Sequence, residues 1–195
     1  MSIRRAAKNK IVVCGAKTHK SKQYSSEVIR TMILASEHHG LEHARWRDLA
    51  PEYQEHCFAV IRNPWDRTVS RWQFGVVAEG KNYSFREFLK ERNIYGGREY
   101  FWHRAIRGWY PQADYVTDES GKIRVDCLRF ATGDVEEYLH LRKLPKHNAT
   151  GHKYYQEYYG TEEIEIVADW YKRDIDLFGF SFDSAATRNI WMPSL

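Results

Sequence analysis

The apolar run Cys57–Ile61 is followed directly by a cation, a side chain that can cap a helix and a proline, which are Arg62, Asn63 and Pro64. Asn63 is a good N-cap and Pro64 suits the first position of a helix, so a helix is predicted to begin here. A guanidinium beside a helix N-terminus, where backbone N–H groups lack partners, favours the binding of phosphate or sulfate. The residues therefore predict an anion site.

Two residues along this predicted helix bear on the anion site in opposite ways. Ser70 shares a helix face with Arg67 and could add a hydroxyl donor to a bound anion. In an alternative interpretation, Arg62 pairs with Asp66 and only braces the helix. Both interpretations stay open at this point.

The elements that must position these residues follow an alternating order. Lys10–Cys14 is a short apolar run and predicts a buried strand. A helix is predicted from Ser25 or Ser26 to Gly40, and Cys57–Ile61 predicts a second strand. The order strand, loop, helix, strand favours an α/β fold with a parallel sheet and ligands at the carboxyl ends of its strands.

Three further elements are predicted in the second half of the chain. Ser84 and Glu87 form a capping box, which predicts a helix from Ser84 to about Arg92. The segments 113–116 and 123–127 flank a turn and predict a hairpin. A long helix is predicted from Thr161 to Phe178, ended by Gly179. No linker is evident, so residues 1–195 are expected to form a single domain, with residues 1–9 as a flexible basic tail.

Composition excludes several classes of protein. Hydrophobic residues make up 43% of the 195 residues, which suffices for one core, and no stretch approaches the roughly 20 apolar residues of a membrane span. The three cysteines are isolated and no signal peptide is recognised, so a cytoplasmic protein without a disulfide framework is expected. The net charge of +4 is concentrated near the N-terminus and favours an anionic partner.

The segment R-N-P-W-D-R-x-x-S at residues 62–70 resembles the 3′-phosphate-binding segment of sulfotransferases that use 3′-phosphoadenosine 5′-phosphosulfate (PAPS). It is most similar to the carbohydrate-type (sulfotransferase family 2-like) branch. Other segments resemble this branch in the same order, and together the likeness covers residues from about 10 to 183. These segments are Pro111–Val116, Gly121–Asp126, Leu144–Asn148, Tyr155–Tyr159 and Asp174–Gly179.

The resemblance implies a P-loop-like three-layer fold with a central, mainly parallel sheet flanked by helices. It implies transfer of a sulfuryl group from PAPS to a hydroxyl acceptor, with a glycan as the default. No metal, nucleic acid or membrane span is expected. Arg62 and Ser70 match positions that hold the 3′-phosphate.

The loop after the first strand resembles the family's 5′-phosphosulfate loop but departs from its P-K-T-G-G-T-S pattern. Lys17 and Thr18 follow the strand, and Ser25 and Ser26 stand at the helix start. These four residues are assigned to the 5′-phosphosulfate, with Lys17 also catalytic. A second register would use Lys22. Because the loop is longer and lacks glycines, a catalytically inactive nucleotide-binding relative is an alternative.

A histidine in an H-A segment before the second strand is the family's base, and His43 matches it. Histidine accepts a proton near neutral pH. A competing motif, H-x-x-E-H, spans His39, Glu42 and His43 and is the inverted zinc-peptidase signature. That chemistry needs both histidines on one helix, and Gly40 stands between them. A zinc-dependent hydrolase is kept as the alternative function.

Overall fold

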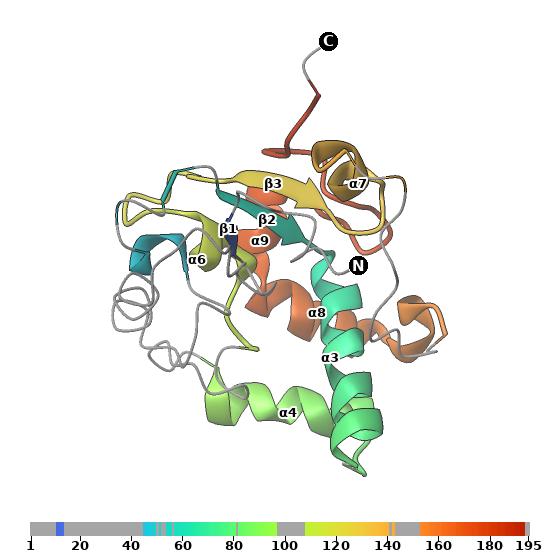
Figure 1. Ribbon diagram of the computed structural model, residues 1–195. Helices are drawn as coiled ribbons and strands as arrows, with labels where there is room; N and C mark the ends of the chain where they lie inside the picture. Colours follow the sequence, from blue (N-terminus) through green and yellow to red (C-terminus); the bar gives the residue numbers. More distant parts are fainter. Residues whose placement is uncertain are drawn as a thin grey trace. The chain divides into compact units, whose positions relative to one another are not determined.

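The computed structural model describes residues 11–13, 45–49, 51, 54, 55, 57–80, 82–96, 108–140, 142 and 153–193. They show a mixed α/β protein with a parallel sheet and helices (Figure 1). The chain divides into two compact units, each built from separate stretches of sequence. The first unit comprises Met1–Ile61, Gln112–His147 and Asn189–Leu195, and the second comprises Arg62–Pro111 and Asn148–Arg188.

The first unit contains a three-stranded parallel sheet. Its strands are β1 (Ile11–Val13), β2 (Cys57–Ile61) and β3 (Asp126–Arg129), in the order β1-β2-β3. Val12 of β1 pairs with Phe58 of β2, and Ala59 of β2 pairs with Cys127 of β3. Both strands predicted in the first part of the sequence are confirmed, and their parallel pairing brings their carboxyl ends to one edge.

Strand β2 lies between its two neighbours, and its composition suits that place. Four of its five residues are buried, with Phe58 and Ala59 fully so. A continuous apolar run of this kind is typical of a strand in a parallel sheet that is covered on both faces. Phe58 packs with Leu128 and Val135 in a buried cluster. The backbone N–H of Trp191 donates to the Cys127 carbonyl at 2.7 Å, which ties the C-terminal stretch to β3.

The predicted hairpin at 113–127 is wrong in its first arm. Residues Gln112–Val116 form the short helix α6, in which every residue except Asp114 is buried. A turn does follow: Gly121 N–H donates to the Asp118 carbonyl at 3.0 Å, and Thr117 and Ile123 form an isolated antiparallel bridge. A short apolar run fits helix and strand alike, so the sequence alone misassigned it.

Two short helices complete the described part of this unit. The 3-10 helix η1 (Trp46–Asp48) contacts α6, and Arg47 Nη2 lies 3.5 Å from Thr117 Oγ1. Helix α7 (Asp134–Tyr138) packs against β3. Arg129 makes a bidentate ion pair with Asp134 at 2.8 and 2.9 Å, and hydrogen bonds hold the pKa of Asp134 below its usual value.

The second unit is helical in its described part. It contains α3 (Pro64–Glu79), α4 (Phe85–Tyr95), the 3-10 helix η3 (Tyr155–Tyr158), α8 (Thr161–Trp170) and α9 (Lys172–Phe178). Helix α3 contacts α4, η3 and α8. Trp65 and Val69 of α3 are buried, and Trp65 Nε1 donates to the Ile164 carbonyl at 3.0 Å.

The residues that begin and end these helices form the caps that the sequence predicts. The Ser84 hydroxyl accepts from Glu87 N–H at 3.2 Å and the Glu87 carboxylate accepts from Ser84 N–H at 2.7 Å, so the capping box is confirmed. The helix continues to Tyr95, three residues beyond the expected end. Gly179 ends the last helix with a φ of 66°, a conformation that favours glycine.

The predicted single helix from Thr161 to Phe178 is divided in two at Tyr171. This residue has a φ of −103° and a ψ of 24°, outside the helical range. Its ring is buried, with the Arg67 guanidinium 5.5 Å from the ring centroid. The break therefore coincides with the burial of one aromatic side chain, and the sequence did not indicate it.

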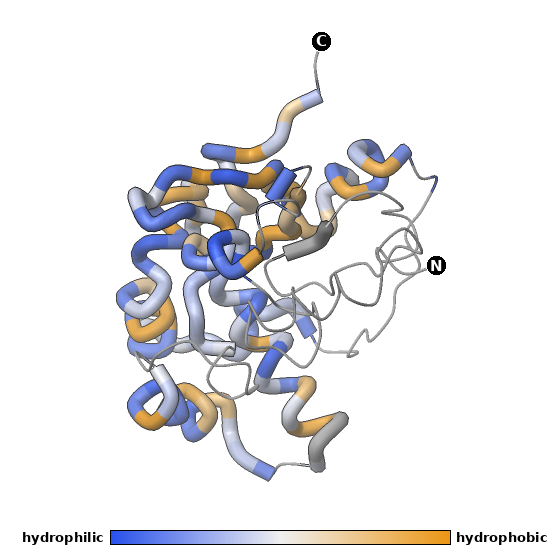
Figure 2. Tube along the Cα trace, turned by 60° about the vertical axis from the view of Figure 1, so that its left-hand side comes forward, coloured by the Kyte–Doolittle hydropathy of each residue, from blue (hydrophilic) through white to orange (hydrophobic). Residues whose placement is uncertain are grey.

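Along the described helices, hydrophobic residues form separate bands between hydrophilic ones (Figure 2). This pattern is typical of helices that bury one face. In the part of the chain that the structure describes, no helix has the length and apolar character needed to cross a membrane.

Two buried thiols give a direct test of this sheet. Cys57 and Cys127 are 4% and 1% exposed, and burial raises the pKa of each to about 12. At pH 8 a thiol with such a pKa is about 0.01% thiolate, and the thiolate is the reactive form. We expect both cysteines to resist alkylation in the native protein and to react fully in denaturant, as measured by peptide mass spectrometry. Rapid native labelling of both would contradict the buried sheet.

Candidate functional site

The candidate site lies at the start of α3, where the chain leaves the sheet. Arg62 follows Ile61, the last residue of β2, and Pro64 begins α3. Because β1 and β2 are parallel, the chain also leaves β1 at the same edge of the sheet. An edge of this kind, at the carboxyl ends of parallel strands, is where α/β proteins commonly bind ligands.

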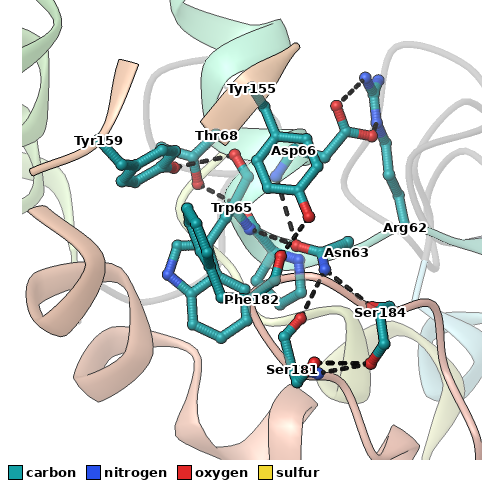
Figure 3. Close-up of polar contacts among 11 residues, drawn as sticks. Arg62, Asn63, Trp65, Asp66, Thr68, Tyr155, Tyr159, Ser181, Phe182 and Ser184 are labelled. Atoms are coloured by element: carbon teal, nitrogen blue, oxygen red, sulfur yellow. Dashed lines mark hydrogen bonds and ion pairs between the residues drawn. The ribbon is translucent and has the colours of Figure 1, made fainter. Parts of the chain in front are cut away.

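The first turn of α3 is capped from within the chain (Figure 3). The Asn63 side-chain oxygen accepts from Trp65 N–H at 3.0 Å and from Asp66 N–H at 3.4 Å. Pro64 has no N–H, and Arg67 N–H donates to the Asn63 carbonyl at 2.8 Å. The expectation that backbone N–H groups here lack partners is therefore wrong. An anion at the start of α3 would have to displace the Asn63 oxygen to reach these N–H groups.

The guanidinium of Arg62 pairs with the carboxylate of Asp66 (Figure 3). Arg62 Nε lies 2.5 Å from Asp66 Oδ2, and Arg62 Nη2 lies 2.8 Å from Asp66 Oδ1. The two side chains are 22% and 20% exposed, so the pair is partly shielded from water. The pairing named in the alternative interpretation is confirmed, and an anion at Arg62 has to compete with this carboxylate.

Arg67 and Ser70, the two other residues of α3 considered for the anion site, have different surroundings. Both terminal nitrogens of Arg67 donate to the Tyr110 carbonyl at 3.0 Å, so this guanidinium is engaged with the backbone. Ser70 is half-buried and stands four residues after Asp66, on the same helix face. Helix periodicity therefore puts Ser70 on the side of α3 that carries the Asp66–Arg62 pair.

Two tyrosines from the segment Tyr155–Tyr159 pack beside the start of α3, and sequence reasoning gave them no role. The Tyr159 hydroxyl donates to the Trp65 carbonyl at 2.9 Å, and the Tyr155 hydroxyl donates to the Phe182 carbonyl. Burial raises the pKa of Tyr159 well above its usual value and the pKa of Tyr155 to about 12. Both are therefore neutral donors at neutral pH and not bases. Their spacing alone could not reveal which carbonyls they meet.

The side-chain nitrogen of Asn63 makes two more contacts that the sequence did not indicate. It donates to the Ser181 carbonyl at 2.8 Å and to the Ser184 carbonyl at 2.9 Å. These partners lie 118 and 121 residues along the chain. The N-cap of α3 is thereby joined to the turn Ser181–Ser184, which is closed by a hydrogen bond of 2.8 Å between its two serine hydroxyls.

Several of the predicted site residues lie outside the described residues. They are Lys17, Thr18, Ser25, Ser26 and His43, together with Lys22 of the second loop register and His39 and Glu42 of the zinc motif. The described part of the chain contains no group of three or more His, Cys, Asp or Glu side chains able to hold a metal ion. Of the predicted site residues, the structure thus places Arg62 and Ser70.

Comparison of the chain with protein-family models, with the curated proteins and with the solved structures finds no match. What the site can do therefore has to be argued from its own residues. It consists of a partly shielded guanidinium, its carboxylate partner, a capped helix start and a hydroxyl on the same helix face. Such an arrangement can hold one compact anion through charge and hydrogen bonds from side chains.

Proposed function

We propose that the chain is a PAPS-dependent sulfotransferase that moves a sulfuryl group to a hydroxyl acceptor on a carbohydrate. The observation that carries the proposal is the parallel pairing of β1 with β2, with Arg62 directly after β2. This pairing supports a common edge for the loop after β1 and the residue after β2. The proposed activity comes from the resemblance of residues 10–183 to the carbohydrate-type branch, whose segments occur in the same order.

Donor binding is divided between two groups of residues in this proposal. Arg62 and Ser70 hold the 3′-phosphate, and Lys17, Thr18, Ser25 and Ser26 hold the 5′-phosphosulfate. The proposed fold is the P-loop-like three-layer arrangement, of which the parallel strands β1, β2 and β3 would be the central layer. The proposed location is the cytoplasm, where thiols such as those of Cys57 and Cys127 stay reduced.

The Asp66 carboxylate competes with the 3′-phosphate for the guanidinium of Arg62. A phosphate monoester carries between one and two negative charges near pH 7 and has three acceptor oxygens, so it competes well with a carboxylate for a guanidinium. We expect the bidentate Arg62–Asp66 pair to loosen when the 3′-phosphate binds. The pair would then keep Arg62 oriented before the donor arrives.

The proposed reaction is an in-line transfer. The acceptor hydroxyl oxygen forms a bond to sulfur as the bond from sulfur to the 5′-phosphate oxygen breaks, and PAP (adenosine 3′,5′-bisphosphate) leaves. His43 takes the proton from the acceptor hydroxyl. Lys17 stabilises the negative charge that develops on the departing phosphate. No metal has a role in this scheme.

Calorimetric titration with PAP tests the proposal most directly. We expect one PAP per chain, and at least tenfold weaker binding of AMP, which lacks the 3′-phosphate. No binding of PAP at near-millimolar concentration would contradict the proposal. Binding of PAP without any transfer from PAPS would instead identify the chain as an inactive nucleotide-binding relative.

A further inference from the structure

The side chain of Asn63 uses its full hydrogen-bonding capacity to join two distant segments. Its oxygen accepts two backbone N–H groups of α3, and its nitrogen donates to two carbonyls of the turn Ser181–Ser184 (Figure 3). A side-chain amide has two acceptor sites and two donor hydrogens, so all four are used here. An N-cap alone needs only the oxygen. The two donor bonds therefore call for a separate explanation.

Aromatic packing holds the same turn against the same part of α3. Phe182, inside the turn, makes edge-to-face contacts with Trp65, Tyr155 and Tyr159, with ring centroids 5.7, 5.6 and 5.4 Å away. The Tyr155 hydroxyl also donates to the Phe182 carbonyl. The turn is thus seated through an aromatic side chain and through three of its carbonyls, and Asn63 supplies two of those hydrogen bonds.

Arg62 depends on this arrangement in two ways. Asn63 is the next residue in the chain, so its backbone angles (φ −47°, ψ 127°) set how Arg62 is oriented relative to the first turn of α3. The Asp66 carboxylate that holds the Arg62 guanidinium stands on the helix turn whose N–H groups bond the Asn63 oxygen. A shift of Asn63 would therefore move both the backbone and the counter-ion of Arg62.

We propose that Asn63 is a positioning residue for the 3′-phosphate site, and that the turn Ser181–Ser184 holds it in place. This inference rests on the proposed function, because the 3′-phosphate is the ligand that Arg62 is proposed to bind. Asn63 does not itself need to touch the donor. It fixes Arg62 and Asp66 in one geometry, so that the guanidinium need not be ordered when the anion binds.

The test uses Asn63→Ser in the full chain. A serine still caps α3 through its hydroxyl oxygen but lacks the two N–H donors to Ser181 and Ser184. The matched control is Ser84→Ala, which removes the N-cap of α4 in the same unit without touching the start of α3. The measurements are PAP affinity by calorimetry, melting temperature, and hydrogen exchange of peptides covering residues 62–70 and 180–188.

We expect Asn63→Ser to weaken PAP binding at least tenfold while lowering the melting temperature no more than Ser84→Ala does. Ser84→Ala should keep its PAP affinity within twofold. Exchange should rise in both peptides of Asn63→Ser and in neither peptide of the control. Unchanged PAP affinity in Asn63→Ser, or an equal loss in both variants, would overturn the positioning role.

Failure of the proposed function would show itself differently. If the unchanged chain binds no PAP, the sulfotransferase proposal falls, and a role of Asn63 in donor binding falls with it. The exchange measurement still decides whether Asn63 joins the two segments. Unaltered exchange in both peptides of Asn63→Ser would show that the turn is held without it.

Discussion

Replacing Arg62 with alanine is expected to weaken PAP binding by about 10- to 100-fold, because hydrogen bonds to charged groups contribute roughly 1.5–3 kcal/mol. The variant also leaves the Asp66 carboxylate without its bidentate partner, next to the place proposed for the 3′-phosphate. Repulsion between that carboxylate and the phosphate adds to the loss. Calorimetric titration of both proteins with PAP gives the ratio of affinities.

The control for this variant is Arg86→Ala. Arg86 is also an arginine paired with an acidic residue, Glu162, but both side chains are 62% exposed at the surface of the same unit. Its loss changes the net charge equally, so it measures any general electrostatic effect on PAP. We expect the PAP affinity of Arg86→Ala to stay within twofold of that of the unchanged chain.

The bracing interpretation of Arg62 makes the opposite prediction. If Arg62 serves only to hold Asp66 and the first turn of α3, its removal lowers the free energy of unfolding by at most about 1 kcal/mol, as for other partly exposed ion pairs. PAP affinity would then be equal in Arg62→Ala and Arg86→Ala. That result would remove the 3′-phosphate site from the proposal.

Replacing His43 with alanine is expected to lower the rate of sulfuryl transfer by about 100- to 10,000-fold, the usual contribution of a general base. PAP affinity should change less than twofold, since a base for the acceptor hydroxyl does not need to contact the nucleotide. The measurement is transfer of radiolabelled sulfate from PAPS to a pool of desulfated polysaccharides, together with calorimetric titration with PAP.

The control for this variant is His140→Ala, which removes an exposed histidine that follows α7. It should retain the transfer rate of the unchanged chain. Full turnover in His43→Ala would show that the base assignment is wrong. Stoichiometric zinc by elemental analysis, lost together with activity when His39 or His43 is replaced, would favour the alternative zinc-dependent hydrolase.

Signals that act over a few residues were enough to predict several elements. Asn63 and Pro64 fixed the start of α3, the Ser84–Glu87 capping box fixed the start of α4, and Gly179 fixed the end of α9. The wholly apolar run Cys57–Ile61 likewise predicted a buried strand. Each of these signals depends on hydrogen bonds or burial within about one helical turn or one strand, and neighbouring residues in the sequence determine them.

The partners of the site residues were decided by tertiary structure. For Arg62 the sequence offered two partners, an anion and the nearby Asp66, and the structure shows the pair with Asp66. Nothing in the sequence indicated that Arg67 would bond the Tyr110 carbonyl, 43 residues away, or that Asn63 would bond carbonyls 118 and 121 residues away.

The same holds for two elements whose form the sequence misassigned. Residues Gln112–Val116 became a helix rather than a strand, and the segment from Thr161 to Phe178 broke at the buried ring of Tyr171. A short apolar run satisfies burial in either form, and an apolar stripe continues through a break. The choice in each case depends on which distant surface the segment packs against, and no neighbouring residue in the sequence carries that information.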